Sequence, residues 1–329
     1  MEIDESTVGD TPLVELDAGC APTVLGKVEW LNLPGVGHGG ASIKARIAVS
    51  MLDAAEADGH LPGHTVLEAS SGNTARALAR IADARGYDVA VVVPDDIAAG
   101  KRAAIEAVGG TIHEVPAEAG YDALFDRADE LAERGDYWRA DQYRNPANPR
   151  AHEQTGREIW RATDGELRAF VAGVGTGGTV TGVGRALRER DPTIDIVGFE
   201  PDAESHGLHG LKYLRGGGVH PETYVESVLD RKRYVDTDAA HTAARDLAAA
   251  HADAAPTIVD SGQHEPETVR AELRPDGAFL VGPSSGAAVA CVRELDAEGV
   301  LGPEDTVVVP LCDRGHTYPN GDLWGRVVV

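Results

Sequence analysis

The chain is poor in cysteine and has no long apolar run. Its 329 residues include only three cysteines, which form no Cys-x-x-Cys pair and therefore encode neither a disulfide framework nor a zinc site. No stretch approaches the roughly 18 uninterrupted apolar residues of a membrane-spanning helix. Residues 1–5 carry neither a basic start nor an apolar segment of a signal peptide. We therefore expect a soluble protein of a reducing cytoplasm.

Positive charge, and lysine above all, is scarce. There are 54 acidic and 30 basic residues, for a net charge of −24, which excludes nucleic acid as a favoured partner. Only five residues are lysines: Lys27, Lys44, Lys101, Lys212 and Lys232. An acidic surface that avoids lysine is typical of proteins in molar salt, where a Debye length of roughly 3 Å screens self-repulsion. We expect a halophilic host, with an ordinary acidic protein from a GC-rich genome as the alternative.

Short apolar runs rich in β-branched residues alternate with longer segments rich in Ala, Glu and Arg. We expect strands at 65–67, 89–93, 170–172, 194–199, 278–281 and 306–310, and helices at 74–85, 100–108, 179–190 and 285–297. This alternation predicts an α/β fold with a largely parallel sheet, and the length suggests about two domains. Pro146 and Pro149 forbid a continuous helix, so we place a domain crossing there.

The segment 68–75 joins an apolar pair to a helical pattern through a polar turn. Ser70, Ser71 and Thr74 supply hydroxyls, and the first turn of the helix leaves N–H groups without partners. Such a turn suits a small carboxylate, for example that of an amino acid. Simple capping of the helix by the same residues is the alternative.

A glycine-rich turn at 173–179 follows an expected strand and begins an expected helix. Its converging backbone N–H groups predict a phosphate cradle. Gly173, Gly175 and Gly178 also satisfy the dinucleotide pattern, and Glu200 follows at about the distance of a ribose-binding acid. Two flanking threonines favour a terminal phosphate monoester. The NAD site and a turn without any ligand are the alternatives.

Lys44 stands in a glycine- and serine-rich context before a helical pattern that runs to about residue 58. A lysine that forms a Schiff base must lose its proton, which burial near other positive groups promotes. Arg46 is a candidate for such a group. The alternative for Lys44 is a surface lysine at a helix start.

Together, five motifs resemble those of the cysteine synthases, or O-acetylserine sulfhydrylases, which are fold-type II pyridoxal-phosphate (PLP) enzymes. They span roughly residues 8 to 318 in the family's order: Ser42-Ile43-Lys44-x-Arg46, Ser70 to Thr74, Asn145 to Pro149, Gly175 to Thr179 and Gly282 to Ala287. The resemblance implies a two-domain, tryptophan synthase β-like fold with a mainly parallel, helix-flanked sheet in each domain. Residues 40–148 would form a smaller mobile domain carrying the substrate carboxylate loop. Residues 1–39 and 149–329 would form the larger, PLP-binding domain.

The resemblance also implies roles for single residues. Lys44 would hold PLP as a Schiff base and later remove the substrate's α-proton, Asn73 would bond the cofactor's ring hydroxyl, and Ser284 would face its pyridine nitrogen. The phosphate would be held by Gly175, Thr176, Gly177, Gly178 and Thr179. The substrate carboxylate would be held by Ser70, Ser71, Thr74 and Gln142. No metal site is implied.

The implied reaction is a β-replacement in which an activated serine, O-acetylserine or O-phosphoserine, gives an aminoacrylate to which sulfide adds, yielding L-cysteine. The smaller domain would close over the bound carboxylate. Family precedent implies a homodimer, and a serine acetyltransferase is a possible partner. The loop Gly37 to Ser42 is longer than the family's, which leaves the donor and the nucleophile open.

Other interpretations stay open at this stage. A cystathionine β-synthase-like or serine/threonine dehydratase-like lyase, a non-catalytic binding descendant and an NAD-dependent oxidoreductase are the alternatives. Lys212 and Arg215, near Gly216 to Gly218, could bind a phosphate leaving group or be ordinary solvated charges. His206 and His209 lack a third metal ligand, so we expect loop or lid residues. We expect the segment from Asp313 to Tyr318 to support the cofactor; Asp313 as a helix cap is the alternative.

Overall fold

The computed structural model describes residues 3–33, 42–107, 109–217, 219–318 and 322–325. Its strands are β1 (Leu13–Leu16), β2 (Thr23–Val28), β3 (Thr65–Ala69), β4 (Val89–Pro94), β5 (Thr111–Val115), β6 (Tyr137–Arg139), β7 (Ala169–Gly173), β8 (Asp195–Pro201), β9 (Arg231–Val235), β10 (Thr257–Asp260) and β11 (Thr306–Leu311). Its helices are α1 (Lys44–Ala57), α2 (Asn73–Ala84), α3 (Ala99–Glu106), α4 (Asp122–Glu133), α5 (Ala147–Ala162), α6 (Gly178–Arg188), α7 (Thr237–Ala250), α8 (Pro266–Leu273) and α9 (Pro283–Ala297). Short 3-10 turns are η1 (Glu5–Thr7), η2 (Glu29–Leu31), η4 (Ala117–Ala119), η5 (Leu214–Gly216), η6 (Glu226–Val228) and η7 (Gly315–Thr317).

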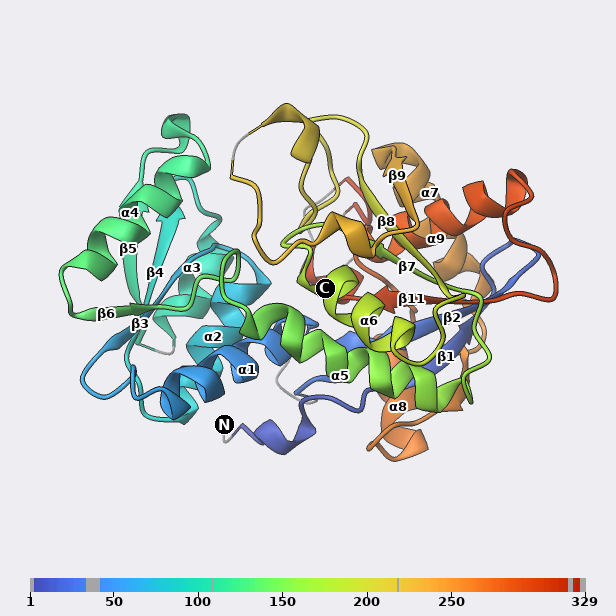
Figure 1. The fold of residues 1–329 in the computed structure, drawn as a ribbon, viewed down its shortest axis with the longest axis horizontal. Helices are drawn as coiled ribbons and strands as arrows, with labels where there is room; N and C mark the ends of the chain where they lie inside the picture. Colours follow the sequence, from blue (N-terminus) through green and yellow to red (C-terminus); the bar gives the residue numbers. More distant parts are fainter. Residues whose placement is uncertain (1–2, 34–41, 108, 218, 319–321, 326–329) are drawn as a thin grey trace.

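The strands form two sheets. One has the order β10-β1-β2-β11-β7-β8-β9, in which β1 runs antiparallel to both of its neighbours and the other pairs are parallel. The other has the order β5-β4-β3-β6 and is parallel throughout. Figure 1 shows the four-stranded sheet at the left with α2, α3 and α4, and the seven-stranded sheet at the right. The expected α/β class is confirmed.

Parallel sheets covered by helices on both faces need strands that are apolar on both sides, and the central strands meet that need. In β4, Val89 to Val93 are all buried, and in β7 the four residues from Ala169 to Ala172 are buried. Separate apolar cores lie around the two sheets. The expected strands at 65–67, 89–93, 170–172 and 306–310 fall inside observed strands, and the one at 194–199 starts one residue before β8.

Two expectations about elements were wrong. Residues 278–281 form no strand, because their only ladder contact is an isolated bridge between Val281 and Arg314. Pro149 does not break the chain at 145–149 but stands in the first turn of α5, which begins at Ala147. The first turn tolerates proline because its N–H groups have no helical acceptor anyway.

Helix α5 joins the two halves of the molecule. It packs against α1 on the side of the four-stranded sheet and against α6 on the side of the seven-stranded sheet, and it runs along the lower front of the molecule in Figure 1. The division into domains at residues 40 and 148 and the mobility of the smaller one stay predictions. Residue 40 itself, with the rest of Gly37 to Ala41, lies outside the described residues.

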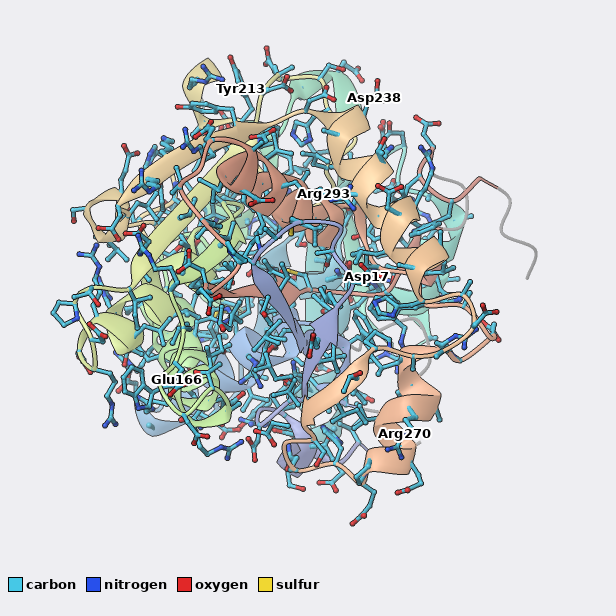
Figure 2. All side chains as sticks on the ribbon, turned by 90° about the vertical axis from the view of Figure 1, so that its right-hand side faces the viewer. Asp17, Glu166, Tyr213, Asp238, Arg270 and Arg293 are labelled. Carbon is cyan, nitrogen blue, oxygen red and sulfur yellow. The ribbon has the colours of Figure 1, made fainter. Side chains whose placement is uncertain are left out.

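Charged side chains are spread over the surface. Figure 2 shows acidic and arginine side chains over one face of the seven-stranded half, among them Asp17, Glu166, Asp238 and Arg270, all of which are exposed. Within the described part of the chain, no helix is long and apolar enough to cross a membrane.

Candidate active site

A single cleft of about 1110 Å³ brings the expected site residues together from distant parts of the chain. Its lining includes Lys44 from the start of α1, Ser284 from the start of α9, and two loops that each join a strand to a helix. The expected residues that line it are Lys44, Ser70, Ser71, Asn73, Thr74, Gln142, Gly175, Thr176, Gly177, Thr179 and Ser284. Gly178 lies buried behind them as the first residue of α6. The roles of these residues stay predictions.

The first loop, between β3 and α2, presents hydroxyl groups to the cleft. Helix α2 has Gly72 as its N-cap and no side-chain cap, so the hydroxyls are not used for capping. The Ser70 hydroxyl accepts a hydrogen bond from the Gly72 N–H at 3.2 Å, which tightens the turn. The Thr74 hydroxyl donates to Gln142 Oε1 at 2.7 Å. This arrangement favours the carboxylate site over the capping alternative.

Gln142 reaches the loop because the chain turns sharply after β6. Asp141 has a φ of 50°, a left-handed conformation that is uncommon outside glycine. Its carbonyl accepts the N–H groups of Arg144 and Asn145, which holds the turn. Behind Gln142 lies Glu68, a 2% exposed carboxyl that sequence analysis missed. Burial, and then the charge of Asp141, raises the pKa of Glu68 to about 7.

The second loop, between β7 and α6, is shaped by its glycines. Gly177 has a φ of +75°, and a Cβ there would lie 2.3 Å from Tyr224 Cβ. A Cβ on Gly175 would lie 2.1 Å from the Gly210 carbonyl oxygen, and one on Gly178 would lie 2.0 Å from Asn148 Oδ1. Only glycine keeps the start of α6 open, and the N–H groups of a helix start favour a phosphate.

Asn148 connects the two loops. Its Nδ2 donates to the Gln142 carbonyl at 2.7 Å and to Thr176 Oγ1 at 3.0 Å. His152, also on α5, lies 3.2 Å from Thr179 Oγ1 through Nε2. Burial, and then the charges of Lys44 and Arg46, lowers the pKa of His152 well below its usual value, so this imidazole is neutral. The Asn-Pro motif was interpreted only as a chain crossing, so both contacts were missed.

Arg46 lies in a buried cluster of ion pairs, and its expected effect on Lys44 stays a prediction. Its guanidinium bonds Glu29 Oε2 at 2.6 Å and Glu158 Oε2 at 2.7 Å. Lys27 joins the cluster through Glu158 at 2.8 Å. Arg46 therefore holds the start of α1 to the seven-stranded half of the molecule.

Polar groups also gather around Asn73. Its Nδ2 donates to Asp313 Oδ2 at 2.6 Å, and the Tyr318 hydroxyl donates to the same oxygen at 2.6 Å. Asp313 Oδ1 is buried without a hydrogen-bond partner among the described residues. Burial raises the pKa of Asp313. Ser284 hydrogen-bonds the thiol of Cys312, whose pKa burial raises to about 12.

Glu200 does not present a free carboxylate for a ribose. Its Oε2 accepts the Leu214 N–H at 3.1 Å, and its Oε1 pairs with Lys232 at 2.7 Å. The cleft also holds an amine, Lys44, that a dinucleotide site does not require. The structure thus disfavours the NAD interpretation of the glycine-rich turn.

The two basic residues near the glycine run, Lys212 and Arg215, take different contacts. Lys212 lines the cleft, donates to the Val219 carbonyl at 3.0 Å and lies over the Tyr143 ring at 4.7 Å. Arg215 instead stacks on Tyr234 at 3.6 Å and does not line the cleft. Gly218 of the nearby glycine run lies outside the described residues.

The two histidines of the same loop take separate contacts. His209 stacks on Tyr318 with ring centroids 5.3 Å apart, whereas His206 Nδ1 accepts the Leu208 N–H. Burial lowers the pKa of each. Among the described residues, no group of three or more His, Cys, Asp or Glu side chains could hold a metal ion.

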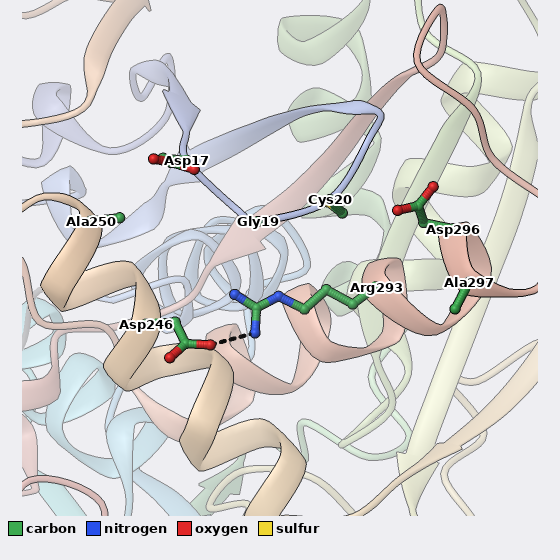
Figure 3. Close-up of a pocket in the computed structure, with 8 residues that line it drawn as sticks. All are labelled: Asp17, Gly19, Cys20, Asp246, Ala250, Arg293, Asp296 and Ala297. Atoms are coloured by element: carbon green, nitrogen blue, oxygen red, sulfur yellow. Dashed lines mark hydrogen bonds and ion pairs between the residues drawn. The ribbon is translucent and has the colours of Figure 1, made fainter.

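A second pocket of about 510 Å³ lies on the seven-stranded half, between the loop that joins β1 to β2 and helices α7 and α9. Figure 3 shows Arg293 reaching across it to Asp246, and the pair is 2.7 Å apart. The Arg293 Nε donates to the Ala18 carbonyl, and Asp296 accepts the Ala21 N–H. Arg293, Asp246 and Asp296 already have partners in this pocket, whereas the first cleft brings the expected site residues together.

The groups of the first cleft fit pyridoxal phosphate. Lys44 offers an amine, the start of α6 offers backbone N–H groups and two threonine hydroxyls, and Ser284 offers a neutral hydroxyl. The glycines leave the space that a phosphate needs. A buried oxygen of Asn148, Oδ1, has no hydrogen-bond partner among the described residues.

Comparisons with known proteins agree with this geometry. Residues 5–313 match the family model described as "Pyridoxal-phosphate dependent enzyme". Cysteine synthase B of Escherichia coli is 35% identical over 325 residues, covering 98% of this chain and 96% of that protein. Cysteine synthase B of Pseudomonas aeruginosa is 36% identical, covering 96% of this chain and 95% of that protein.

Solved structures show the same likeness. An O-ureido-L-serine synthase superposes with a TM-score of 0.81 at 32% identity, covering 98% of this chain and 95% of that chain. A cysteine synthase from Entamoeba histolytica superposes with a TM-score of 0.80 at 28% identity, covering 97% and 89%. From the cleft, the family match and these relatives together, the chain belongs to the pyridoxal-phosphate dependent enzymes of fold type II, in the cysteine synthase family.

Proposed function

We propose that this enzyme makes L-cysteine by β-replacement, from O-acetylserine or O-phosphoserine and sulfide. The observation that carries the proposal is that one cleft holds the amine of Lys44 between a phosphate loop and a carboxylate loop. An amino acid whose carboxylate is held by one loop would then lie beside a cofactor whose phosphate is held by the other. Cysteine synthases at 35% and 36% identity over almost the whole chain support the same activity.

The residues of the cleft would have different roles in the reaction. Bound PLP would supply the electron sink that allows the Cα–H bond to break and the β-substituent to leave. Lys44 would hold the cofactor covalently and, once free, take the proton from Cα. Ser70, Ser71, Thr74 and Gln142 would fix the substrate carboxylate and so orient Cα toward that amine. Ser284 would place a neutral hydroxyl at the pyridine nitrogen, leaving the ring unprotonated.

The cleft is positive although the protein is strongly acidic. Three of the five lysines, Lys44, Lys101 and Lys212, line it. Positive charge in a cleft raises the local concentration of anions, and O-phosphoserine and hydrosulfide carry net negative charge near neutrality, whereas O-acetylserine is a zwitterion whose carboxylate alone would be attracted. Lys212 keeps open the proposal that a phosphate leaving group is bound, whereas Arg215 faces Tyr234 instead.

The test is the visible absorption spectrum of the purified protein in high salt, before and after each donor, followed by assay of cysteine after sulfide is added. We expect bound cofactor whose band shifts with one of the two donors. Lys44→Ala should lose the covalently attached cofactor. Lys101→Ala, which removes another lysine of the same cleft, should keep it.

Other outcomes would replace the proposal. A protein that binds no PLP would support the non-catalytic descendant or, with nicotinamide bound, the oxidoreductase. Bound cofactor with pyruvate or 2-oxobutyrate as product would support a dehydratase-like lyase. Cystathionine formed from serine and homocysteine would support the cystathionine β-synthase-like alternative.

We also propose a halophilic, cytoplasmic enzyme. A net charge of −24 with five lysines supports adaptation to salt, and the three cysteine thiols are unpaired, as a reducing compartment requires. Loss of folding after dialysis into low salt would support the halophilic assignment. Indifference of the unfolding temperature to salt would contradict it.

We further propose a homodimer with a possible serine acetyltransferase partner, as family precedent implies. Light scattering in high salt measures the mass against the 34.5 kDa of one chain. Inhibition by a peptide from the C-terminus of a serine acetyltransferase would support docking in the cleft. A monomer, or a peptide without effect, would remove the respective proposal.

A further inference from the structure

We propose that Glu68 is the positioning residue that orients Gln142 and thereby builds the carboxylate site of the substrate. The inference rests on the proposed β-replacement, because it concerns the binding of that reaction's amino-acid donor. Glu68 is the fourth residue of β3 and does not line the cleft. It acts through Gln142, which does.

The contacts between the two side chains fix the amide of Gln142. The Gln142 backbone N–H donates to Glu68 Oε2 at 3.3 Å, and its Nε2 donates to Glu68 Oε1 at 3.4 Å. On its other side, Gln142 Oε1 accepts the Thr74 hydroxyl at 2.7 Å. The two contacts at the amide, with Glu68 Oε1 and with the Thr74 hydroxyl, therefore decide which end of the amide faces each neighbour, and the backbone bond holds the Glu68 carboxyl beside it.

This orientation leaves a donor for the substrate. An amide nitrogen carries two hydrogens, and Glu68 receives only one of those on Gln142. The second stays available to an oxygen in the cleft. A carboxylate accepts but does not donate, so it would meet this hydrogen and not the amide oxygen, which Thr74 already occupies. If the amide turned over, its oxygen would face the carboxylate of the substrate, and two groups that only accept hydrogen bonds would repel each other there.

Burying the carboxyl of Glu68 costs free energy, and no ion pair among the described residues offsets that cost. It is 2% exposed and forms no ion pair among the described residues. The nearby Arg139 pairs instead with Asp129 and Asp141. A buried carboxyl without a cation is costly, and such groups gather at functional sites. The two long hydrogen bonds from Gln142 are the side-chain hydrogen bonds of Glu68 among the described residues, and they point to that function.

The surroundings of Glu68 do not offer it another role. The charged and titratable groups that face it are Arg139 at the end of β6, Asp141 in the turn that follows, and the hydroxyls of Tyr121 and Tyr143. Asp141 repels the ionised form of Glu68, which favours the protonated one. A protonated carboxyl still accepts hydrogen bonds from Gln142 and adds no charge beside the carboxylate of the donor.

The test compares Glu68→Gln and Glu68→Asp with the wild-type holoenzyme. We expect the KM for the donor to rise about tenfold, as for a lost hydrogen bond to a charged group, with kcat within about twofold. In the background of Gln142→Ala, Glu68→Gln should cause no further rise, because the residue through which it acts is gone. Glu114→Gln, at an exposed carboxylate of β5 in the same sheet, is the matched control and should keep the wild-type KM.

Clear outcomes oppose the proposal. It is overturned if both Glu68 variants keep the wild-type KM, or if the KM effects of Glu68→Gln and Gln142→Ala add. It is also overturned if both variants unfold or lose kcat and cofactor absorbance together, since Glu68 is then a structural residue. If the wild-type enzyme turns over neither donor, the proposed function fails instead. Titration of the cofactor band with the amino acid then tests Glu68 through the dissociation constant.

Discussion

The two proposed anion sites of the cleft, one for the cofactor phosphate and one for the substrate carboxylate, are built in opposite ways. The phosphate loop is defined by backbone atoms, and an added Cβ on Gly175 or Gly177 would overlap neighbouring atoms. The carboxylate loop is defined by side chains, and a Cβ on Gly72 would meet nothing closer than the Ser70 hydroxyl at 3.8 Å. A rigid backbone cradle suits a group that stays bound. Hydroxyl and amide groups held by hydrogen bonds suit a substrate that binds and leaves at each turnover.

The largest expected effect is a loss of cofactor affinity when the phosphate loop is changed and the carboxylate loop is left intact. Gly175→Ala places a Cβ 2.1 Å from the Gly210 carbonyl oxygen, which cannot move without shifting the backbone. We expect roughly 3 kcal/mol or more of lost cofactor affinity, seen as loss of bound PLP on gel filtration. Gly72→Ala, the matched change in the other loop, should keep the cofactor. Equal cofactor loss in both variants would contradict the comparison.

The next effect concerns pH. The pKa of Glu68 is raised to about 7 by burial and by the charge of Asp141, so folding favours its neutral form. Its contribution is fully present below about pH 4.5 and is lost as pH rises through 7. The free energy of unfolding should fall by about 3 kcal/mol over this window relative to Glu68→Gln, measured by urea unfolding.

Cofactor binding at the phosphate loop should show no matching change as pH rises through 7. His152, behind Thr179, has a pKa held well below its usual value by burial, so its imidazole stays neutral as pH rises through 7. Retention of the cofactor should therefore stay flat over this range. A pH-dependent cofactor affinity would show that the two sites are less separate than their structures suggest.

A smaller effect is expected from the residue that links the two sites. Asn148→Ala removes hydrogen bonds to the Gln142 carbonyl and to Thr176, so it should weaken both cofactor and donor binding by about 1–2 kcal/mol each. Asn145→Ala removes a bond to the Ala140 carbonyl and does not touch the phosphate loop. It should raise only the donor KM, which kinetics and cofactor titration distinguish.

The smallest effect is expected at the rim of the carboxylate loop. Ser70→Ala removes a hydroxyl that accepts the Gly72 N–H and faces the cleft. We expect about 1 kcal/mol of lost donor binding, seen as a severalfold rise in KM with unchanged cofactor absorbance. A change in the cofactor spectrum would mean that the loop also supports the cofactor.

Local sequence patterns were enough to predict the central strands and to identify the motifs. The apolar runs around 66 and 91 become buried strands because a covered parallel sheet needs apolar residues on both faces. The segment 278–281 is equally apolar but forms no strand, because no ladder partner lies beside it apart from one bridge. Proline at 149 was misinterpreted because its effect depends on its position within a helix.

The sequence by itself determined the α/β class, the family and the residues that line the cleft, because these depend on periodicity and on short motifs whose order survives in the chain. Only the tertiary structure decided which other side chains contact the residues of these motifs. Arg46 joins a buried ion cluster with Glu29 and Glu158, and Glu68 lies behind Gln142, 74 residues away in the chain. Such contacts depend on how separate strands and helices pack, so no local pattern of residues encodes them.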